Sequence, residues 1–253
     1  MPMPNLAFPN VATPVGSIPY YAIRFSPAEQ RNGLAARYSW LHEIDRIIST
    51  IKDPGVARLK LDWWHKEWTQ ALSGSATHPI TIACEETLLR NATHMIDGII
   101  KFSEKAILGF NALNDQDWLA EMRQRAYLQF AFLSSDELTE NSIDFAMRSQ
   151  LAHWLFSLPE QLSIGRTLFP QSHIKDAQEA LHSVEHLNFW LNTPLWHMLT
   201  EPLEHQHEHK LIDRFLKQQE ADLKRLRKVG FSSSRTVAYP VIRLIRAWQA
   251  RDV

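Results

Sequence analysis

The 253-residue sequence has little of what disulfide-linked, turn-rich or membrane-spanning architectures need. Its single cysteine, Cys84, excludes an internal disulfide and suits a reducing compartment. Only eight glycines are present, which disfavours an all-β or turn-rich fold. No uninterrupted apolar run approaches the ~18 residues that a transmembrane helix needs. A globular protein remains, and we expect Cys84 to be a small buried residue of its core.

Net charge is also nearly absent. The formal charge of -1 predicts no nucleic-acid-binding surface over the molecule as a whole. The first ten residues, MPMPNLAFPN, contain neither a basic segment nor an apolar run, so we predict no signal peptide. These features together predict a cytoplasmic protein, with peripheral association at a membrane surface left open.

What the sequence does have is core-forming residues at helical spacing. Hydrophobic residues make up 45% of the chain, and nine of them are tryptophans, so a sizeable core can form. The prolines of residues 1–19 predict an extended N-terminal arm, and residues 20–253 are expected to form a single domain. We predict a first helix from Ser26 to about Thr50, with Ser26 as its cap. Further helices are expected at 54–73, 79–91, 94–110, 115–134, 136–158, 174–191, 204–229 and 235–251.

No strand-like periodicity, internal repeat or low-complexity tract interrupts this pattern, which favours one all-α bundle. Adjacent aromatic residues on the second expected helix, Trp63 and Trp64, are expected to pack between helices, with Trp63 the more deeply buried of the two.

Four stretches of the sequence carry a family resemblance. They are SIPYYAIRF at 17–25 with HEID at 42–45, DPGVARLKLDWW at 53–64, GRTLFP at 165–170, and the tail from Gly230 to Trp248. In this order and spacing they resemble the squalene/phytoene synthase family of head-to-head prenyl transferases. The resemblance covers nearly the whole chain. It implies an isoprenoid-synthase-type fold, in which antiparallel helices surround a deep central cavity.

Enzymes of that family ionise an allylic diphosphate and join two prenyl chains. The resemblance implies that magnesium ions hold the leaving diphosphate, and magnesium prefers carboxylate oxygens. Two Asp-x-x-x-Asp motifs on facing helices supply these oxygens in the family. The spacing of four residues places both carboxylates of one motif on the same helix face.

Most of these carboxylates are missing here. At the first motif Asp45 matches the leading aspartate, whereas Ser49 stands at the closing position. At the second motif Ser157 and Gln161 stand where the family has aspartates, and His153 stands where asparagine is frequent. One carboxylate cannot neutralise several divalent ions, so we predict that metal affinity is largely lost and that no cofactor is bound, with Mg²⁺ required only if a diphosphate site survives.

Two residues within the second motif affect whether a nearby carboxylate can supply a missing metal ligand. Pro159 lies inside the motif and is expected to break or kink its helix. Glu160 can face the cavity only if that helix survives, and we favour an exposed carboxylate near a helix end. Asp45 and Glu160 are therefore the two candidate metal ligands. At the first motif, Arg46 replaces the second adjacent aspartate that is usual in the family.

Basic residues and histidines offer further candidates. Arg24, Arg58 and Arg166 lie in the family-like stretches, so they are candidate diphosphate-binding residues or structural ion-pair partners. His205 and His209 are four residues apart and can share a transition metal, although a solvated helix start is the favoured reading. The basic C-terminal segments suggest an anionic membrane surface or a protein partner; their residues are Lys217, Lys224, Arg225, Arg227, Lys228, Arg235, Arg243, Arg246 and Arg251.

Three functions follow from these observations. The leading hypothesis is a catalytically inactive family member that serves in binding, assembly or as a scaffold. In kind it resembles the complex I assembly factor that itself resembles phytoene synthase. The second is an active prenyl transferase using farnesyl or geranylgeranyl diphosphate with altered metal ligands. The third is a carrier of an isoprenoid or other lipid, which requires an open apolar cavity.

Overall fold

The computed structural model describes residues 6–85, 92–110, 113–134, 138–166, 168–200 and 209–231. Regular structure within these ranges is helical, and no strand occurs among them, so the prediction of an all-α bundle is confirmed. The helices are α1 (Ile18–Arg24), α2 (Arg31–Thr50), α3 (Pro54–Leu72), α4 (Pro79–Glu85), α5 (Ala92–Leu108), α6 (Asp115–Ser134), α7 (Glu140–Phe156), α8 (Leu158–Ser163), α9 (Gln171–Ala180), α10 (Val184–Leu191), α11 (His197–Thr200) and α12 (Lys210–Val229). Short 3-10 turns lie at Ala28–Gln30 and Pro194–Trp196.

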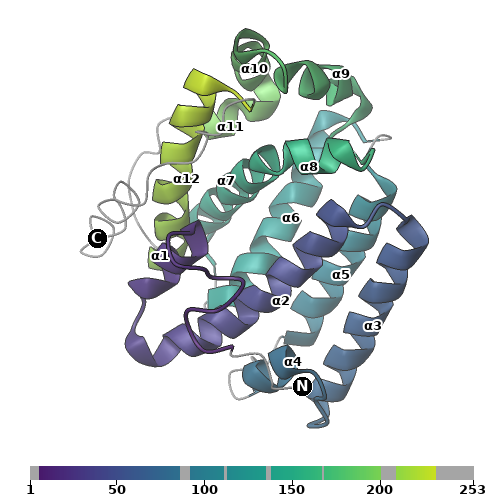
Figure 1. Ribbon diagram of the computed structural model, residues 1–253, viewed down its shortest axis with the longest axis vertical. Coiled ribbons are helices and arrows are strands. Elements are labelled where there is room, and N and C mark those ends of the chain that lie inside the picture. Colours follow the sequence, from purple (N-terminus) through teal and green to yellow (C-terminus); the bar gives the residue numbers. More distant parts are fainter. Residues whose placement is uncertain are drawn as a thin grey trace.

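Five long helices form a continuous row in the order α3, α5, α6, α7 and α12, in which each helix packs against the next (Figure 1). Helix α2 packs against α3, α5 and α6, and α1 packs against both α2 and α12. Helices α1 and α2 therefore cover one side of the row. Helices α9 and α10 pack together at one end of the molecule, and α4 lies near the other end (Figure 1).

An aromatic cluster fixes α2 in place against the row. Trp40 of α2 packs edge-on against Trp68 of α3 and against Phe132 of α6, with ring centroids 5.2 and 4.9 Å apart. All three side chains are fully buried. Edge-to-face aromatic pairs add roughly 0.5–1.5 kcal/mol beyond the burial of their area. The cluster thereby positions the segment of α2 that begins one turn later with Asp45.

A second aromatic cluster anchors the chain that follows α8. It contains Trp118 of α6, Phe169, Trp190 of α10 and Trp196, all fully buried. The indole Nε1 of Trp118 also donates to the backbone oxygen of Leu168 at 2.7 Å. Because α6 holds this connection directly, the position of α8 relative to α6 and α2 is fixed.

The N-terminal region differs from the sequence prediction. Residues up to 19 were expected to be extended, but α1 begins at Ile18, where Ser17 caps it by accepting from the Tyr20 amide. Ser26 was expected to cap the next helix. Its hydroxyl instead accepts from Nη1 of Arg214 at 2.9 Å, and a 3-10 turn separates it from α2. Proline-rich sequence suits a helix start as well as an extended arm, which is why the pattern missed α1.

Other helix boundaries follow proline and capping residues. Pro159 was expected to interrupt its helix, and α7 indeed ends at Phe156 while Pro159 lies in the first turn of α8. The single helix expected over 174–191 is two helices, because Ser183 caps α10 through the His186 amide. The expected helix at 235–251 lies outside the described residues.

The expectation for the adjacent tryptophans was reversed. Trp63 is 47% exposed, whereas Trp64 is 5% exposed and packs in the core. Cys84 is buried as predicted, and burial raises the pKa of its thiol to about 12. Among the helices described, none combines the length and apolar character needed to cross a bilayer.

Candidate functional site

The four motif positions identified in the sequence line one pocket of about 250 Å³. Asp45 and Ser49 come from the last turns of α2, whereas Ser157 and Gln161 come from the junction of α7 and α8. Contacts between α2 and α8 bring the two motifs together. The structure therefore places these positions as two facing motifs, with neutral side chains at three of the four.

Asp45 is paired with a buried cation that the sequence analysis did not identify. Nη2 of Arg125, on α6, donates to Oδ1 of Asp45 at 3.1 Å. The Arg125 side chain is 0% exposed and that of Asp45 is 20% exposed. Burial acts to raise the pKa of the Asp45 carboxyl, but hydrogen bonds and charge from His153 and Arg125 outweigh it, so that this pKa is lowered.

A sequence signal for Arg125 does exist. Arg125 falls on the same helical stripe as Trp118 and Met122, at intervals of seven and three residues, and both of those residues are buried. The guanidinium carbon of Arg125 also lies 5.6 Å from the ring centroid of Phe102. Its Nε and Nη1 have no hydrogen-bond partner in the described structure, so Asp45 is the main compensation for its charge.

His153 contacts the second oxygen of the same carboxylate. Its Nε2 lies 3.4 Å from Oδ2 of Asp45, and its side chain is 42% exposed. Each oxygen of Asp45 therefore has a nitrogen partner from a different helix, Arg125 on α6 for Oδ1 and His153 on α7 for Oδ2.

The second motif has become a neutral hydrogen-bonded pair. Nε2 of Gln161 donates to Oγ of Ser157 at 2.6 Å, and Ser157 Oγ donates to the backbone oxygen of Trp154 at 3.1 Å. Gln161 is buried, at 1% exposure. The two side chains bond to one another at the helix break and present no negative charge to the pocket, although Oε1 of Gln161 has no partner in the described structure.

These residues do not fit a magnesium–diphosphate cluster. Such a cluster needs several carboxylate oxygens on divalent ions. Among the described residues that line the pocket, Asp45 is the only carboxylate, and its oxygens are already engaged by Arg125 and His153. In the part of the chain that the structure describes, no group of three or more His, Cys, Asp and Glu side chains lies close enough to hold a metal ion.

The candidate basic residues lie apart from one another. Arg166 is buried and donates from Nη1 to the backbone oxygen of Ile48 and from Nη2 to that of Ile51 at 2.9 Å, so it binds the C-terminal end of α2. Arg24 is exposed at the end of α1, and Arg58 is exposed on α3 beside a separate surface pocket. None of the three lines the motif pocket.

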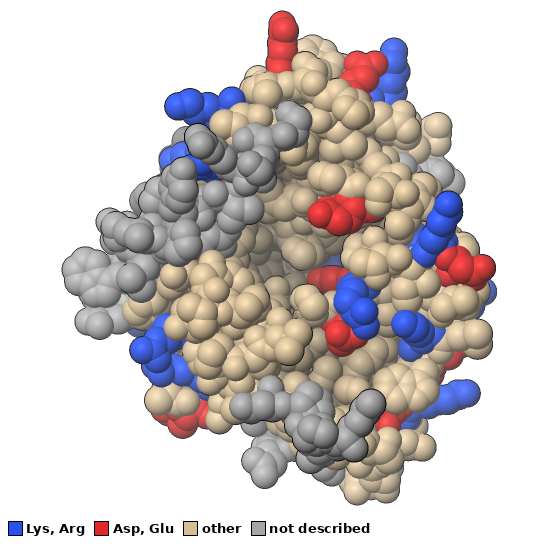
Figure 2. All heavy atoms as spheres, in the orientation of Figure 1, with Lys and Arg blue, Asp and Glu red and all other residues tan. Residues whose placement is uncertain are grey.

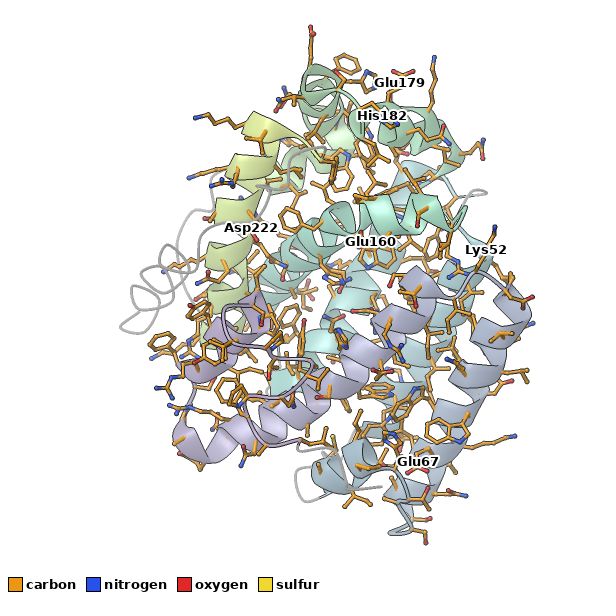
Figure 3. The ribbon with its side chains drawn as sticks, viewed as in Figure 1. Lys52, Glu67, Glu160, Glu179, His182 and Asp222 are labelled. Carbon is orange, nitrogen blue, oxygen red and sulfur yellow. The ribbon has the colours of Figure 1, made fainter. Side chains whose placement is uncertain are left out.

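The remaining candidates lie mainly at the surface. Glu160 is exposed on α8 and does not line the motif pocket (Figure 3). His205 falls outside the described residues, whereas Nδ1 of His209 accepts from the Ile212 amide at the start of α12. Of the basic C-terminal residues, Lys217, Lys224, Arg225, Arg227 and Lys228 lie on α12, and Arg235, Arg243, Arg246 and Arg251 are outside the described residues.

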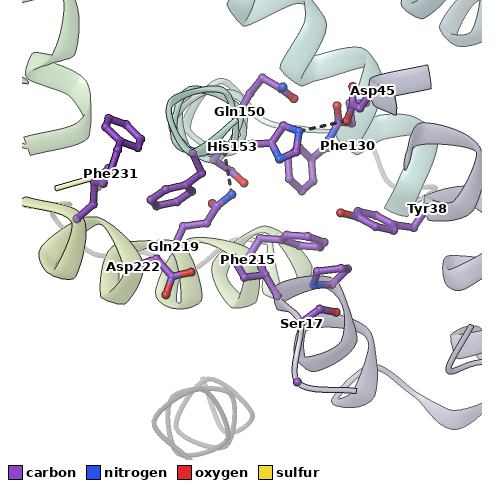
Figure 4. Close-up of a pocket in the computed structure, with 17 residues that line it drawn as sticks. Ser17, Tyr38, Asp45, Phe130, Gln150, His153, Phe215, Gln219, Asp222 and Phe231 are labelled. Carbon is purple, nitrogen blue, oxygen red and sulfur yellow. Dashed lines mark hydrogen bonds and ion pairs between the residues drawn. The ribbon is translucent and has the colours of Figure 1, made fainter. Parts of the chain in front are cut away.

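A larger central cavity of about 430 Å³ adjoins the motif pocket and shares Asp45 and His153 with it. Figure 2 shows the corresponding face hollowed near its middle, with walls made mostly of uncharged residues. In Figure 4 the lining runs from Tyr38 and Asp45 on one side to Asp222 and Phe231 on the other. Sequence reasoning expected a deep cavity only through the family resemblance, and helices α1, α2, α6, α7 and α12 supply its walls.

Comparison with known proteins bears on this geometry. The family model described as squalene/phytoene synthase matches residues 14–211, which is most of the chain. No curated protein and no solved structure gives a significant match. The matched segment includes α1, both motifs and Arg125, so the family model covers the helices of the motif pocket, but it ends at the start of α12, which forms one wall of the larger cavity.

Proposed function

The chain belongs to the squalene/phytoene synthase family, and we propose that it is a non-catalytic member that binds a ligand or a partner without ionising a prenyl diphosphate. The observation that carries this proposal is the buried ion pair of Asp45 and Arg125. A protein cation occupies the neighbourhood in which the family's chemistry requires metal cations.

Electrostatics gives this observation its weight. A divalent ion bound to Oδ1 of Asp45 would lie within roughly 5 Å of Arg125 Nη2, given metal–oxygen distances of about 2.1 Å. At an effective dielectric constant of about 20, the repulsion between a divalent and a unit charge at that distance is roughly 6 kcal/mol. Neutral Ser49, Ser157 and Gln161 supply no negative charge to offset it. The pocket therefore favours Arg125 over a metal ion.

Two roles fit a non-catalytic member. The first is a scaffold for binding or assembly. The complex I assembly factor that resembles phytoene synthase is an example of a protein with this resemblance that acts in assembly, and it implies nothing about the partner of this chain. The second is a carrier of an isoprenoid or other lipid, which is favoured by the cavity of about 430 Å³ with Phe130, Phe215 and Phe231 in its lining.

An active prenyl transferase with altered ligands is the competing function. It relies on Asp45 and Glu160 as metal ligands, together with Arg166 as a diphosphate-binding residue. Glu160 is exposed outside the motif pocket, and the guanidinium of Arg166 is engaged by the backbone oxygens of Ile48 and Ile51, so neither observation favours activity.

Calorimetric titration tests the proposal directly. The purified chain is titrated with a non-hydrolysable farnesyl diphosphate analogue, once with Mg²⁺ and once with a chelator. We expect no magnesium-dependent heat, because one neutralised carboxylate cannot hold the metal cluster. Saturable binding that appears only with Mg²⁺ would show that the diphosphate site has survived and would refute the proposal.

A further inference from the structure

A surface groove between α2 and α3 is lined by exposed apolar side chains. The groove has a volume of about 390 Å³ and lies between two helices that pack against one another (Figure 1). Its lining on α3 includes Val56, Leu59 and Trp63, which are 46%, 69% and 47% exposed. Three of the nine large hydrophobic side chains that are exposed among the described residues therefore line one groove. Single exposed apolar residues are ordinary on a protein surface, whereas a contiguous set marks an interaction site.

Helical spacing makes these three residues a single stripe, called the α3 stripe below. Leu59 and Trp63 follow Val56 by three and seven residues, so all three side chains project from the same side of α3. The stripe extends about 10.5 Å along the helix axis, which is roughly two helical turns. A partner helix that lies in a groove places its apolar anchors at the same intervals, so the stripe has the length that such a helix needs.

Packed side chains hold the groove in shape. Trp64 is 5% exposed, and its ring centroid lies 4.9 Å from that of Trp63 and 4.9 Å from that of His78, in both cases edge-on. Ile47 of α2 is also buried and belongs to the same lining. Because these rings are already fixed in the free chain, little side-chain freedom is lost when a partner binds.

The charges of the lining favour an acidic partner. Arg46 and Lys60 are the cations among the described lining residues, and Glu43 is the anion. Oε2 of Glu43 accepts from Nε and Nη2 of Arg46 at 3.2 and 2.8 Å, so these two charges offset one another. Lys60 is exposed and forms no ion pair with another described residue. The connection between the helices holds Lys52 and Asp53, whose charges balance, which leaves Lys60 as the cation without a counter-charge (Figure 3).

His78 adds a hydrogen-bond donor to the same lining. Its Nδ1 accepts from the Ile80 amide at 3.2 Å, so the proton of the neutral ring is on Nε2. Burial lowers the pKa of His78 against the charges of Glu67 and Glu43, and the ring is therefore neutral at pH 7. The imidazole N–H and the Lys60 ammonium both need an acceptor, and a carboxylate supplies an acceptor together with negative charge.

We propose that this groove binds a helical segment of another protein, whose apolar side chains cover the α3 stripe and whose carboxylate pairs with Lys60. The inference rests on the proposed function, because it states the kind of partner that a scaffold would take. A bilayer is a poorer match, since it is flat and its anionic headgroups would face Glu43. A symmetric contact with a second copy would set Lys60 against the same groove, whose carboxylate is already paired with Arg46.

Selection from a peptide library tests the groove directly. Phage that display random peptides of about 16 residues, roughly four helical turns, are selected on the purified full chain and counter-selected on the variant Leu59→Ala/Trp63→Ala. We expect the enriched peptides to carry apolar residues at i, i+3 or i+4, and i+7, with Asp or Glu among them. The dissociation constant of an enriched peptide is then measured by fluorescence anisotropy.

Single variants assign the binding to the stripe. Trp63→Ala should weaken peptide binding about thirtyfold and Leu59→Ala about tenfold, because both remove apolar anchors of the groove. Leu108→Ala is the matched control, since Leu108 is 70% exposed on α5 and lies outside the groove, and it should change the dissociation constant by less than about twofold.

Charge reversal tests the acidic character of the partner. Lys60→Glu should weaken binding about tenfold, and a peptide in which lysine replaces the acidic residue should recover most of that loss. Lys66→Glu, exposed on α3 but outside the groove, should leave binding within about twofold of the parent.

The contrary outcomes are distinct. The inference is overturned if no peptide is enriched, if the enriched peptides lack acidic residues, or if their binding is unchanged by Trp63→Ala and Lys60→Glu. Binding to vesicles of phosphatidylcholine and phosphatidylserine that Trp63→Ala abolishes would assign the groove to a membrane surface instead. A dimer that Trp63→Ala dissociates in sedimentation would assign it to a second copy. Each of these results leaves the non-catalytic proposal standing, whereas magnesium-dependent binding of the diphosphate analogue would refute that proposal and leave the groove unaffected.

Discussion

Replacing Asp45 by asparagine should destabilise the fold, although asparagine has nearly the same shape. The change leaves Arg125, 0% exposed, without its counter-charge. Removing one partner of a buried ion pair typically costs about 3–5 kcal/mol, and we expect Asp45→Asn to fall in that range. Phe102 and His153 cannot replace the lost charge, because one is an aromatic ring and the other a potential cation.

The reverse change should cost less. Arg125→Met leaves Asp45, which is 20% exposed, borders two pockets and keeps His153 as a partner. We expect about 1–3 kcal/mol for this variant. The double variant Asp45→Asn/Arg125→Met removes both charges and should return to within about 1 kcal/mol of the parent, because a buried pair replaced as a whole is often nearly neutral.

Urea unfolding followed by far-UV circular dichroism measures the free energy of unfolding of the two single variants and the double variant. Asp62→Asn, on the exposed face of α3, serves as a control and should change this free energy by less than about 0.5 kcal/mol. The pKa of Asp45 is lowered in the folded state. The ionised carboxylate therefore stabilises the fold fully at pH values above its unfolded pKa, and this stabilisation is lost as pH falls through its folded pKa. The reasoning is refuted if Asp45→Asn is neutral or stabilising, since that is the behaviour of a carboxylate kept under strain for a metal.

Three further variants test the framework around the site. Glu67 accepts four hydrogen bonds from Thr77, His78 and Thr81, which lower its pKa from 4.5 to about 2 against the opposing effect of burial. Glu67→Gln should therefore reduce the free energy of unfolding by an amount on the order of 3 kcal/mol at pH 7. Unfolding measured at a series of pH values should show that the parent loses this stability as pH falls from about 4.5 towards 2, whereas the variant does not. Arg166→Met should reduce the free energy of unfolding in urea by about 2–3 kcal/mol, because it removes the hydrogen bonds to two backbone oxygens at the end of α2. An equal loss in Arg58→Met, which changes an exposed arginine, would contradict this assignment. Gly230→Ala should lower thermal stability by about 2 kcal/mol, because Gly230 has φ 70° and an added Cβ would lie 2.8 Å from Val184 Cγ2; an unchanged melting temperature would contradict this.

Much of the fold follows from helical periodicity and from the breaks at proline. Residues Pro54, Pro79 and Pro159 each lie in the first turn of a helix, which is the position that their missing amide hydrogen allows. The same periodicity could have ordered the tryptophans correctly. Trp64 and Trp68 continue the buried stripe of α3 at a spacing of four residues, and Trp63 lies about 100° away from it.

The site was predictable only in part. Motif spacing identified Asp45, Ser49, Ser157 and Gln161, and these positions do meet in one pocket. Arg125 was not predicted, because an arginine on an apolar stripe can equally extend its guanidinium to solvent, and the choice depends on a partner from another helix.

Release of diphosphate from a prenyl substrate tests the central claim most directly. The purified full chain is incubated with Mg²⁺ and farnesyl or geranylgeranyl diphosphate, and inorganic diphosphate and prenyl products are quantified against a protein-free control. The ion pair of Asp45 with Arg125 predicts no release above that control. Magnesium-dependent turnover at an enzyme-like rate, on the order of 1 per second or faster, would contradict it.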